Sequence, residues 1–238
     1  MVQSSDQLFK SCREQDIPGE PFLRIPDNCS GDDPLYDQGC QTLCDYSIKS
    51  SSFTLPFTLH IMVQEITLEL IKEQIRTIPD FPKAGILFKD ITTVLKQPEY
   101  FGFIIDEISA SFRNRNITKV VCIESRGFIL GGAIAAAIGA GFVPIRKPGK
   151  LPARTIAKNY TLEYGSNTIE IHTDSLTSSD IVLLHDDLLA TGGTARAAID
   201  LIRVLNPKKI FLSFFCELGY LHGRKVLEGY DINSLIHF

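Results

Sequence analysis

The chain has 238 residues, of which 44% are hydrophobic and 22% are charged, a balance typical of globular proteins with one or two domains. Its formal net charge of −4 argues against a nucleic-acid-binding protein. The acidity belongs to the front of the chain, because residues 1–61 hold four basic and nine acidic residues.

Residues 1–61 show no lasting hydrophobic period, and they contain five prolines and a run of three serines. We therefore expect a mostly disordered acidic extension. The segment is too acidic for a mitochondrial transit peptide and lacks the apolar core of a signal peptide, so we expect a cytoplasmic protein. Two hypotheses stay open: Met62 is the natural start and residues 1–61 are not translated, or residues 1–61 are a genuine extension of a domain that spans 62–238.

From Met62 onward the hydrophobic pattern alternates between helices and strands. Helices are predicted at 65–76, 99–112 and 195–202, and buried strands at 119–123, 142–145, 181–184, 209–215 and 232–238. Residues 78–91 contain two prolines and a glycine, which exclude a helix, and their second half is predicted to be extended. A strand pair is predicted at 157–171, with its turn at 164–167. This alternation predicts an α/β fold, with a twisted parallel sheet flanked by helices.

Residues 127–145 carry no charge over 19 positions, so a membrane span has to be considered. The stretch is rich in glycine and alanine and is interrupted by Pro144, which favours a buried helix followed by a central strand. Cys122 and Cys216 lie in apolar strand-like runs and are interpreted as small core residues. No membrane partner is expected.

The most informative stretch is 181–195, where a buried strand is followed by Asp186, Asp187 and a loop of small residues at 190–194. A loop between the carboxyl end of a strand and the amino end of a helix gathers free N–H groups that favour a phosphate. The Walker lysine and the glycine pattern of dinucleotide-binding folds are both missing. Carboxylates beside a phosphate suit a sugar phosphate, because they accept hydrogen bonds from ribose hydroxyls.

This stretch resembles the phosphoribosyl-diphosphate signature of the type I phosphoribosyltransferases, in the form D-D-L-L-A-T-G-G-T of the adenine-specific enzymes. Further similar segments are P-D-F-P-x-x-G-I-x-F-x-D-I at 79–91, E-S-R-G-F at 124–128, R-K-x-G-K-L-P at 146–152, L-E-Y-G at 162–165, and E-L with G-R at 217–224. The resemblance covers essentially all of 62–238. It implies the type I phosphoribosyltransferase fold with a small hood subdomain.

The resemblance implies a purine salvage reaction, adenine + 5-phospho-α-D-ribose 1-diphosphate → AMP + diphosphate, in a homodimer that uses Mg²⁺ held mainly through the substrate. The residues it implicates are Asp186, Asp187, Glu163 and Tyr164 for catalysis; Ala190, Thr191, Gly192, Gly193 and Thr194 for the 5-phosphate; Ser125, Arg126, Arg146, Lys147 and Lys150 for diphosphate; and Leu87, Phe88 and Lys89 for adenine. Glu163 and Tyr164 would lie on a mobile loop. Lys89 stands where the family form has arginine, which matters little if this residue acts through its backbone.

Two other functions remain as alternatives. The first is a phosphoribosyltransferase for xanthine, hypoxanthine or orotate, although the resemblance of the segment around Phe88 to the adenine-specific enzymes implies adenine. The second is a regulator that senses phosphoribosyl diphosphate without turning it over. Such a protein would usually carry a basic nucleic-acid-binding face, whereas residues 62–238 are nearly neutral and the extension is acidic.

Overall fold

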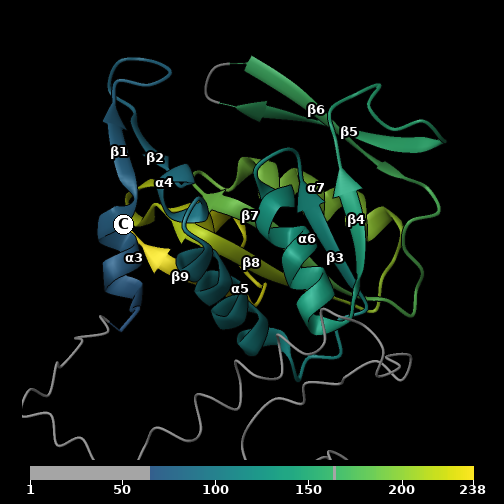
Figure 1. The fold of residues 1–238 in the computed structure, drawn as a ribbon. Coiled ribbons are helices and arrows are strands. Elements are labelled where there is room, and N and C mark those ends of the chain that lie inside the picture. The colour runs from purple at the N-terminus through teal and green to yellow at the C-terminus, as the bar shows by residue number, and fades with distance from the viewer. Residues whose placement is uncertain (1–64, 163–164) are drawn as a thin grey trace, which may run out of the picture. The chain divides into compact units, whose positions relative to one another are not determined.

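The computed structural model of the chain describes residues 65–162 and 165–238, and the predictions made for residues 1–61, Glu163 and Tyr164 lie outside this range. At its centre is a five-stranded parallel sheet in the order β4-β3-β7-β8-β9 (Figure 1). The strands are β3 (Lys119–Ile123), β4 (Gly141–Ile145), β7 (Ile181–Leu189), β8 (Lys209–Glu217) and β9 (Ile232–His237). The predicted parallel α/β sheet is confirmed.

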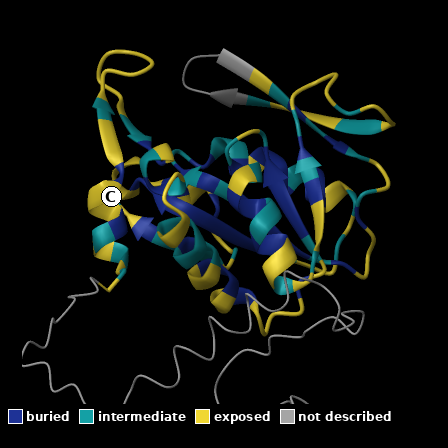
Figure 2. Ribbon diagram, viewed as in Figure 1, coloured by how far each residue is buried: buried dark blue, intermediate teal, exposed yellow. Residues whose placement is uncertain are grey.

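Helices cover both faces of this sheet (Figure 1). One face packs against α3 (Leu68–Gln74), α4 (Thr92–Leu95), α5 (Pro98–Phe112) and α6 (Gly127–Ile138), and the other against α7 (Gly193–Val204). Alternate residues of a strand serve the two cores: Val120 belongs to the first and Val121 to the second. Both faces of β3 and β7 are therefore apolar, which explains their continuous hydrophobic runs (Figure 2).

Two antiparallel hairpins stand at the edges of the sheet. β1 (Arg76–Pro79) pairs with β2 (Leu87–Asp90), and β5 (Thr155–Leu162) pairs with β6 (Gly165–His172). In the first hairpin, Asp90 accepts hydrogen bonds from Thr92 and Arg76, which lower the pKa of its carboxyl to about 2. The chain after β8 forms a short 3₁₀ turn, η1 (Gly219–Leu221), and the helix α8 (Gly223–Val226) before β9.

Several element boundaries differ from the sequence predictions, among them the following three. The first helix is shorter than 65–76, because Thr67 caps its amino end by accepting a hydrogen bond from the N–H of Leu70. β7 runs past the apolar residues to Leu189, since its backbone keeps pairing with β8. The turn predicted at 164–167 is wrong in position, because β6 already begins at Gly165.

Residues 127–145 form a helix followed by a strand, as predicted, but the prediction of a central strand is wrong, because β4 pairs only with β3 in the parallel sheet and lies at its edge. None of the helices in the described parts of the chain is both long and apolar enough to cross a membrane. Cys122 and Cys216 are fully buried in the core, as the sequence predicts.

Candidate functional site

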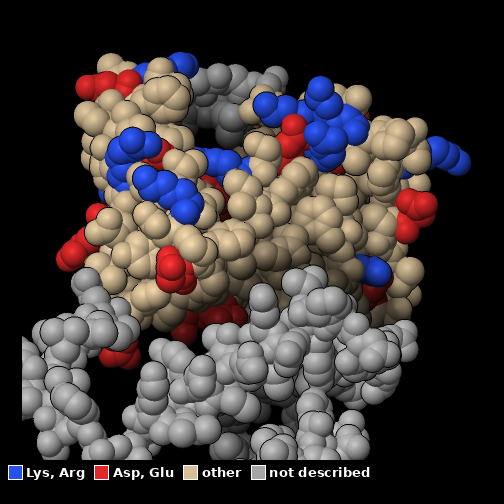
Figure 3. All heavy atoms as spheres, in the orientation of Figure 1, with Lys and Arg blue, Asp and Glu red and all other residues tan. Residues whose placement is uncertain are grey.

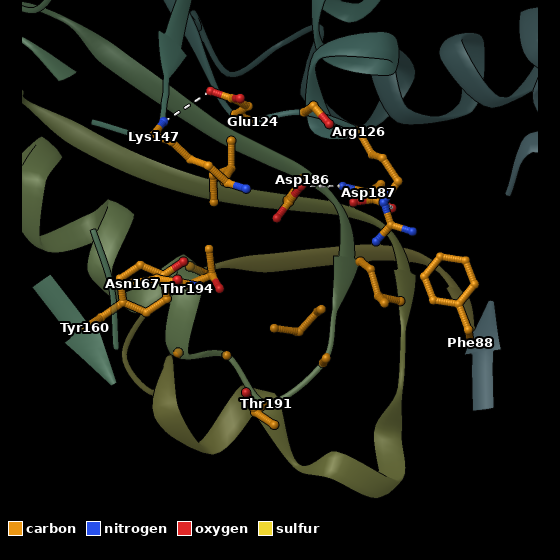
Figure 4. Close-up of a pocket in the computed structure, with 18 residues that line it drawn as sticks. Phe88, Glu124, Arg126, Lys147, Tyr160, Asn167, Asp186, Asp187, Thr191 and Thr194 are labelled. Carbon is orange, nitrogen blue, oxygen red and sulfur yellow. Dashed lines mark hydrogen bonds and ion pairs between the residues drawn. The ribbon is translucent and has the colours of Figure 1, made fainter. Parts of the chain in front are cut away.

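A cavity of about 520 Å³ opens where β3, β4 and β7 end on the same edge of the sheet (Figure 4). It is lined by Phe88, Ile123, Glu124, Ser125, Arg126, Lys147, Tyr160, Asn167 and the continuous segment 186–195. The carboxyl edge of a parallel sheet is the usual place for a ligand in such folds. The structure thus brings together residues from the motifs at 79–91, 124–128, 146–152 and 181–195, whereas the motif at 217–224 does not line the cavity and residues 163 and 164 lie outside the described range.

The loop at 190–194 joins the end of β7 to the start of α7. Gly192 has φ +84°, a left-handed conformation that suits glycine, and it is the residue that caps the helix. Because Gly192 has no side chain, it offers no competing acceptor to the first N–H groups of α7, which can therefore bind an anion. The hydroxyl-bearing residues Thr191 and Thr194 lie on either side of it and line the cavity.

Asp186 and Asp187 lie near the end of β7, before this loop begins, and line the same cavity. The side chain of Asp187 is only 5% exposed, while Asp186 is partly open to the cavity. The backbone N–H of Asp187 donates to Oδ1 of Asp186 over 2.9 Å. Burial raises the pKa of both carboxyls, and for Asp186 the neighbouring charge of Asp187 raises it further. The pair is therefore arranged to take up cationic or hydrogen-bond-donating groups of a ligand.

Arg126 connects the acidic pair to the hood. Its Nε lies 2.9 Å from Oδ2 of Asp187, and its Cζ lies 5.1 Å from the centre of the Phe88 ring (Figure 4). The Coulomb attraction of Arg126 lowers the pKa of Asp187 and partly offsets the effect of burial. Arg126 was predicted to bind diphosphate, and that role stays a prediction, because in this structure its guanidinium lies on Asp187.

The three diphosphate residues predicted after β4, which are Arg146, Lys147 and Lys150, make different contacts in the structure. Glu124 accepts hydrogen bonds from Nε of Arg146, over 3.0 Å, and from the N–H of Lys147, over 3.1 Å. Burial alone would raise the pKa of Glu124, but these donors outweigh it and hold the pKa below 4.5. Arg146 also donates to the backbone carbonyl of Lys150 over 3.2 Å. Arg146 thus holds the loop, whereas the Lys147 side chain lines the cavity and Lys150 does not.

In the hood, only one of the three predicted adenine residues contributes a side chain to the cavity. Phe88 lines it, while Leu87 and Lys89 do not, because neighbouring residues of a strand point to opposite sides. Nζ of Lys89 donates to Oγ1 of Thr77 and lies 4.0 Å from the centre of the Phe238 ring. Backbone contacts of Leu87 and Lys89 with a base stay a prediction.

The sequence did not identify Tyr160 and Asn167, which lie in the second hairpin and line the cavity opposite Phe88 (Figure 4). They are direct partners in the β5–β6 register. A tyrosine in a mostly polar strand is a weak signal in the sequence, and nothing in the sequence marks Asn167. His185, which precedes the acidic pair, is fully buried and hydrogen-bonded to Ser213, and burial lowers its pKa to about 3, so it is a neutral core residue.

Residues 91–235 match the family model described as phosphoribosyl transferase domain. An adenine phosphoribosyltransferase of Phocaeicola vulgatus is 53% identical over 169 residues, which cover 71% of this chain and 97% of that protein. The crystal structure of adenine phosphoribosyltransferase from Thermoanaerobacter pseudethanolicus matches with a TM-score of 0.70 and 49% identity, covering 72% of this chain and 100% of that one.

The crystal structure of APRTase from Giardia lamblia complexed with 9-deazaadenine has a TM-score of 0.70 and 41% identity, and covers 73% of this chain and 99% of that one. The adenine phosphoribosyltransferase of Saccharomyces cerevisiae, complexed with an imino-altritol bisphosphate and adenine, has a TM-score of 0.67 and 36% identity, over 71% and 97% of the two chains. Together with the five-stranded sheet and the loop at its carboxyl edge, these matches show that the chain belongs to the phosphoribosyltransferase family and, within it, to the adenine phosphoribosyltransferases.

Proposed function

We propose that the cavity at the carboxyl edge of the sheet catalyses the transfer of the phosphoribosyl group from 5-phospho-α-D-ribose 1-diphosphate to adenine, which gives AMP and diphosphate. One observation carries this assignment: a phosphate-binding loop, two adjacent carboxylates and an aromatic ring line the same cavity. These are the groups that the phosphate, the ribose and the base of this reaction need.

The loop at 190–194 binds the 5-phosphate through the N–H groups at the start of α7 and the hydroxyls of Thr191 and Thr194. Asp186 and Asp187 accept hydrogen bonds from the 2′- and 3′-hydroxyls of the ribose. Their negative charge favours the cationic character that develops at the anomeric carbon as diphosphate leaves. No protein nucleophile is required, because adenine attacks opposite the leaving group and inverts the anomeric carbon in one displacement.

The leaving diphosphate is stabilised by Ser125, by the guanidinium of Arg126 and by Lys147. All three line the cavity next to the acidic pair. For Arg126 this role requires the guanidinium to move from Asp187 to the diphosphate oxygens, which it can bridge in a bidentate manner. Arg146 shapes this wall from behind, because it donates hydrogen bonds to Glu124 and to the backbone carbonyl of Lys150.

Mg²⁺ fits this site as an ion carried by the substrate. Among the residues that the structure describes, no cluster of three or more His, Cys, Asp and Glu side chains could hold a metal ion. Diphosphate oxygens would supply most of the hard oxygen ligands that Mg²⁺ prefers, with the negative charges of Asp186 and Asp187 close by. When bound, the ion neutralises the negative charge that builds up on the departing diphosphate.

Adenine stacks on Phe88, the aromatic ring of the hood that lines the cavity. Two relatives crystallised as complexes with 9-deazaadenine or adenine support a purine as the base. A role of Glu163 and Tyr164 in excluding water, which would otherwise hydrolyse the activated sugar, stays a prediction. This last role is supported by the hairpin that leads to these two residues, because its Tyr160 and Asn167 already form a wall of the cavity.

The reaction is tested by offering the full chain phosphoribosyl diphosphate and Mg²⁺ with adenine, hypoxanthine, guanine, xanthine or orotate in separate assays. We expect AMP from adenine and little turnover of the other bases, because polar groups matched to one base discriminate by roughly 10⁴-fold. Turnover of a different base would contradict the assignment of the hood. Binding of phosphoribosyl diphosphate without turnover of any base would favour a sensor instead.

We further propose a homodimer in the cytoplasm, formed through α6 and the edge strand β4. The surface over α6 carries few charged side chains (Figure 3). Ile129 is 47% exposed and Phe142 is 41% exposed, and the Phe142 ring packs edge-on against Phe128. Exposed apolar patches of this kind mark protein interfaces. Light scattering on the wild type and on Ile129→Asp should show a dimer and a monomer, respectively.

A further inference from the structure

The loop assigned to the 5-phosphate lies directly against the start of α8. A Cβ atom added to Gly223 would lie 2.3 Å from the carbonyl oxygen of Ala190, which is closer than real Cβ atoms come to any heavy atom. A Cβ atom added to Gly192 would in turn lie 2.6 Å from the carbonyl oxygen of Gly223. The two backbones are therefore in contact, with no side chain between them, and a shift of α8 would shift the loop.

The position of α8 is fixed by an ion pair with the end of β8. Nε of Arg224 donates to both carboxylate oxygens of Glu217, over 2.8 and 2.9 Å. The Glu217 side chain is 7% exposed, while the guanidinium also donates to Oγ of Ser234 over 3.3 Å and to the carbonyl of Ile232 over 3.4 Å. Arg224 is thus held by β8 and β9 together.

The same strand end is also tied to β7. The N–H of Leu218 donates to the carbonyl of Leu189 over 2.9 Å, one residue before the phosphate loop begins. The loop at 190–194 is therefore held at its entrance by Leu218 and along its back by Gly223. Neither Glu217 nor Arg224 lines the cavity, so neither side chain is placed to contact a ligand there directly.

We propose that Glu217 and Arg224 are positioning residues for the reaction, which act through Gly223 to hold the backbone of the phosphate loop in the geometry that binds the 5-phosphate. The proposal rests on the function proposed for the 190–194 loop. It predicts a selective effect: binding of ligands with a ribose 5-phosphate group should weaken, whereas binding of free diphosphate and of adenine should not. A merely structural role would weaken all of them together.

The first test is Gly223→Ala, with Gly219→Ala as the matched control. The control adds the same methyl group four residues earlier, where its nearest neighbour, the carbonyl oxygen of Phe238, is at 3.4 Å. For Gly223→Ala we expect KM for phosphoribosyl diphosphate to rise by roughly tenfold to a hundredfold, as for other displacements on the scale of 1 Å. KM for adenine and the inhibition constant of free diphosphate should change less than about twofold, and the melting temperature should show that the variant is folded.

The second test is Arg224→Gln, with Arg224→Lys and Arg115→Gln for comparison. Arg224→Gln should raise KM for phosphoribosyl diphosphate and weaken AMP binding by the same factor, and Arg224→Lys should restore part of the loss because it keeps the charge beside Glu217. Arg115→Gln removes an exposed cation, whose ion pair with Asp231 spans 3.7 Å, and should change neither value.

Thr194→Ala separates failure of this proposal from failure of the proposed function. If Thr194→Ala raises KM for phosphoribosyl diphosphate but Gly223→Ala and Arg224→Gln do not, the positioning role is wrong and the phosphate loop stands. If none of the three changes this value, the phosphate assignment is wrong and the positioning role is overturned with it. An equal loss of affinity for adenine, diphosphate and AMP in folded variants would also overturn it, since that pattern indicates a general structural role.

Discussion

Asp187 carries its charge in a nearly closed environment, with Arg126 as its ion-pair partner at 2.9 Å. Replacing it by asparagine keeps the shape of the side chain and removes the charge beside the anomeric carbon. Two charges about 4 Å apart, at an effective dielectric constant of about 20, interact by about 4 kcal/mol, so kcat should fall by up to roughly a thousandfold. Steady-state rates and circular dichroism of Asp187→Asn check this expectation.

The control for that variant is Asp231→Asn, which removes an exposed carboxylate at the amino edge of the sheet. It should leave kcat within about twofold of the wild type. A folded Asp187→Asn protein with a nearly unchanged rate would show that the charge does not act on the reacting centre.

Asp186 illustrates a conflict between activity and stability. Burial and the charge of Asp187 raise the pKa of its carboxyl well above 3.8 in the folded chain. Below pH 3.8 the group is protonated in both the folded and the unfolded chain. As the pH rises from 3.8 towards the folded pKa, only the unfolded chain releases the proton, so this group lowers the free energy of unfolding.

Asp186→Asn removes this effect and keeps an oxygen that can accept the hydrogen bond from the N–H of Asp187. The variant should therefore be inactive but melt at a higher temperature than the wild type at neutral pH, by about 2–4 °C for each kcal/mol gained. The difference should shrink as the pH approaches 3.8. Thermal melts between pH 4 and pH 8 test this, and a variant that is less stable than the wild type throughout would contradict it.

Phe88 presents its ring to the cavity from the hood. Truncation to alanine removes the stacking surface for a base but leaves the phosphate loop untouched, so KM for adenine should rise more than KM for phosphoribosyl diphosphate. Phe88→Tyr, which keeps the ring, serves as the control. Separate titrations of the two substrates give both values, and the reverse order of effects would mean that Phe88 does not contact the base.

Among the helices, α6 begins with Gly127, whose backbone lies directly against Asp186. A Cβ atom added to Gly127 would lie 2.8 Å from Oδ1 of Asp186, whereas one added to Gly132 in the same helix would meet nothing within 4 Å. Gly127→Ala should therefore displace the carboxylate and reduce kcat. Gly132→Ala should keep the rate and increase stability by about 0.5–1 kcal/mol, because alanine favours a helix over glycine. Rates and melting temperatures of the two variants distinguish these effects.

Hydrophobic periodicity predicted most of these elements, because the buried strands and the amphipathic helices α5 and α7 leave clear patterns in the sequence. It gave the wrong end for β7, since Asp186 is polar and yet pairs with β8 through the backbone, as do Leu188 and Leu189 beyond it. It also misplaced the turn of the second hairpin, where Gly165 reads as a turn residue but begins β6. Backbone pairing is decided by neighbouring strands, which a local pattern does not contain.

The sequence predicted which segments form the site more completely than it predicted the contacts between their side chains. The sequence indicated which loops meet at the carboxyl edge, because parallel strands bring their ends together. It did not indicate that Arg146 would turn back to Glu124, or that Tyr160 would reach the cavity from a separate hairpin. Such contacts depend on the distance between side chains of different elements, which becomes known only with the fold.

The whole chain carries residues 1–61 in addition to the domain proposed at 62–238. Relatives of about 170 residues match this chain over 71–73% of its length while being covered almost completely themselves. The cavity and both core clusters, as far as the structure describes them, are built from residues beyond position 65. The reaction therefore has its proposed machinery within 62–238.

A protein that begins at Met62 should accordingly keep the activity of the full chain. We expect kcat/KM for adenine within about twofold of the full-length value, and a similar melting temperature, since no part of the proposed site is removed. Detection of a peptide from 4–49 in native cells would show in addition that the front segment is translated. A large loss of activity on truncation, with the fold retained, would mean that residues 1–61 take part in the reaction, and the assignment of the site to 62–238 would be wrong.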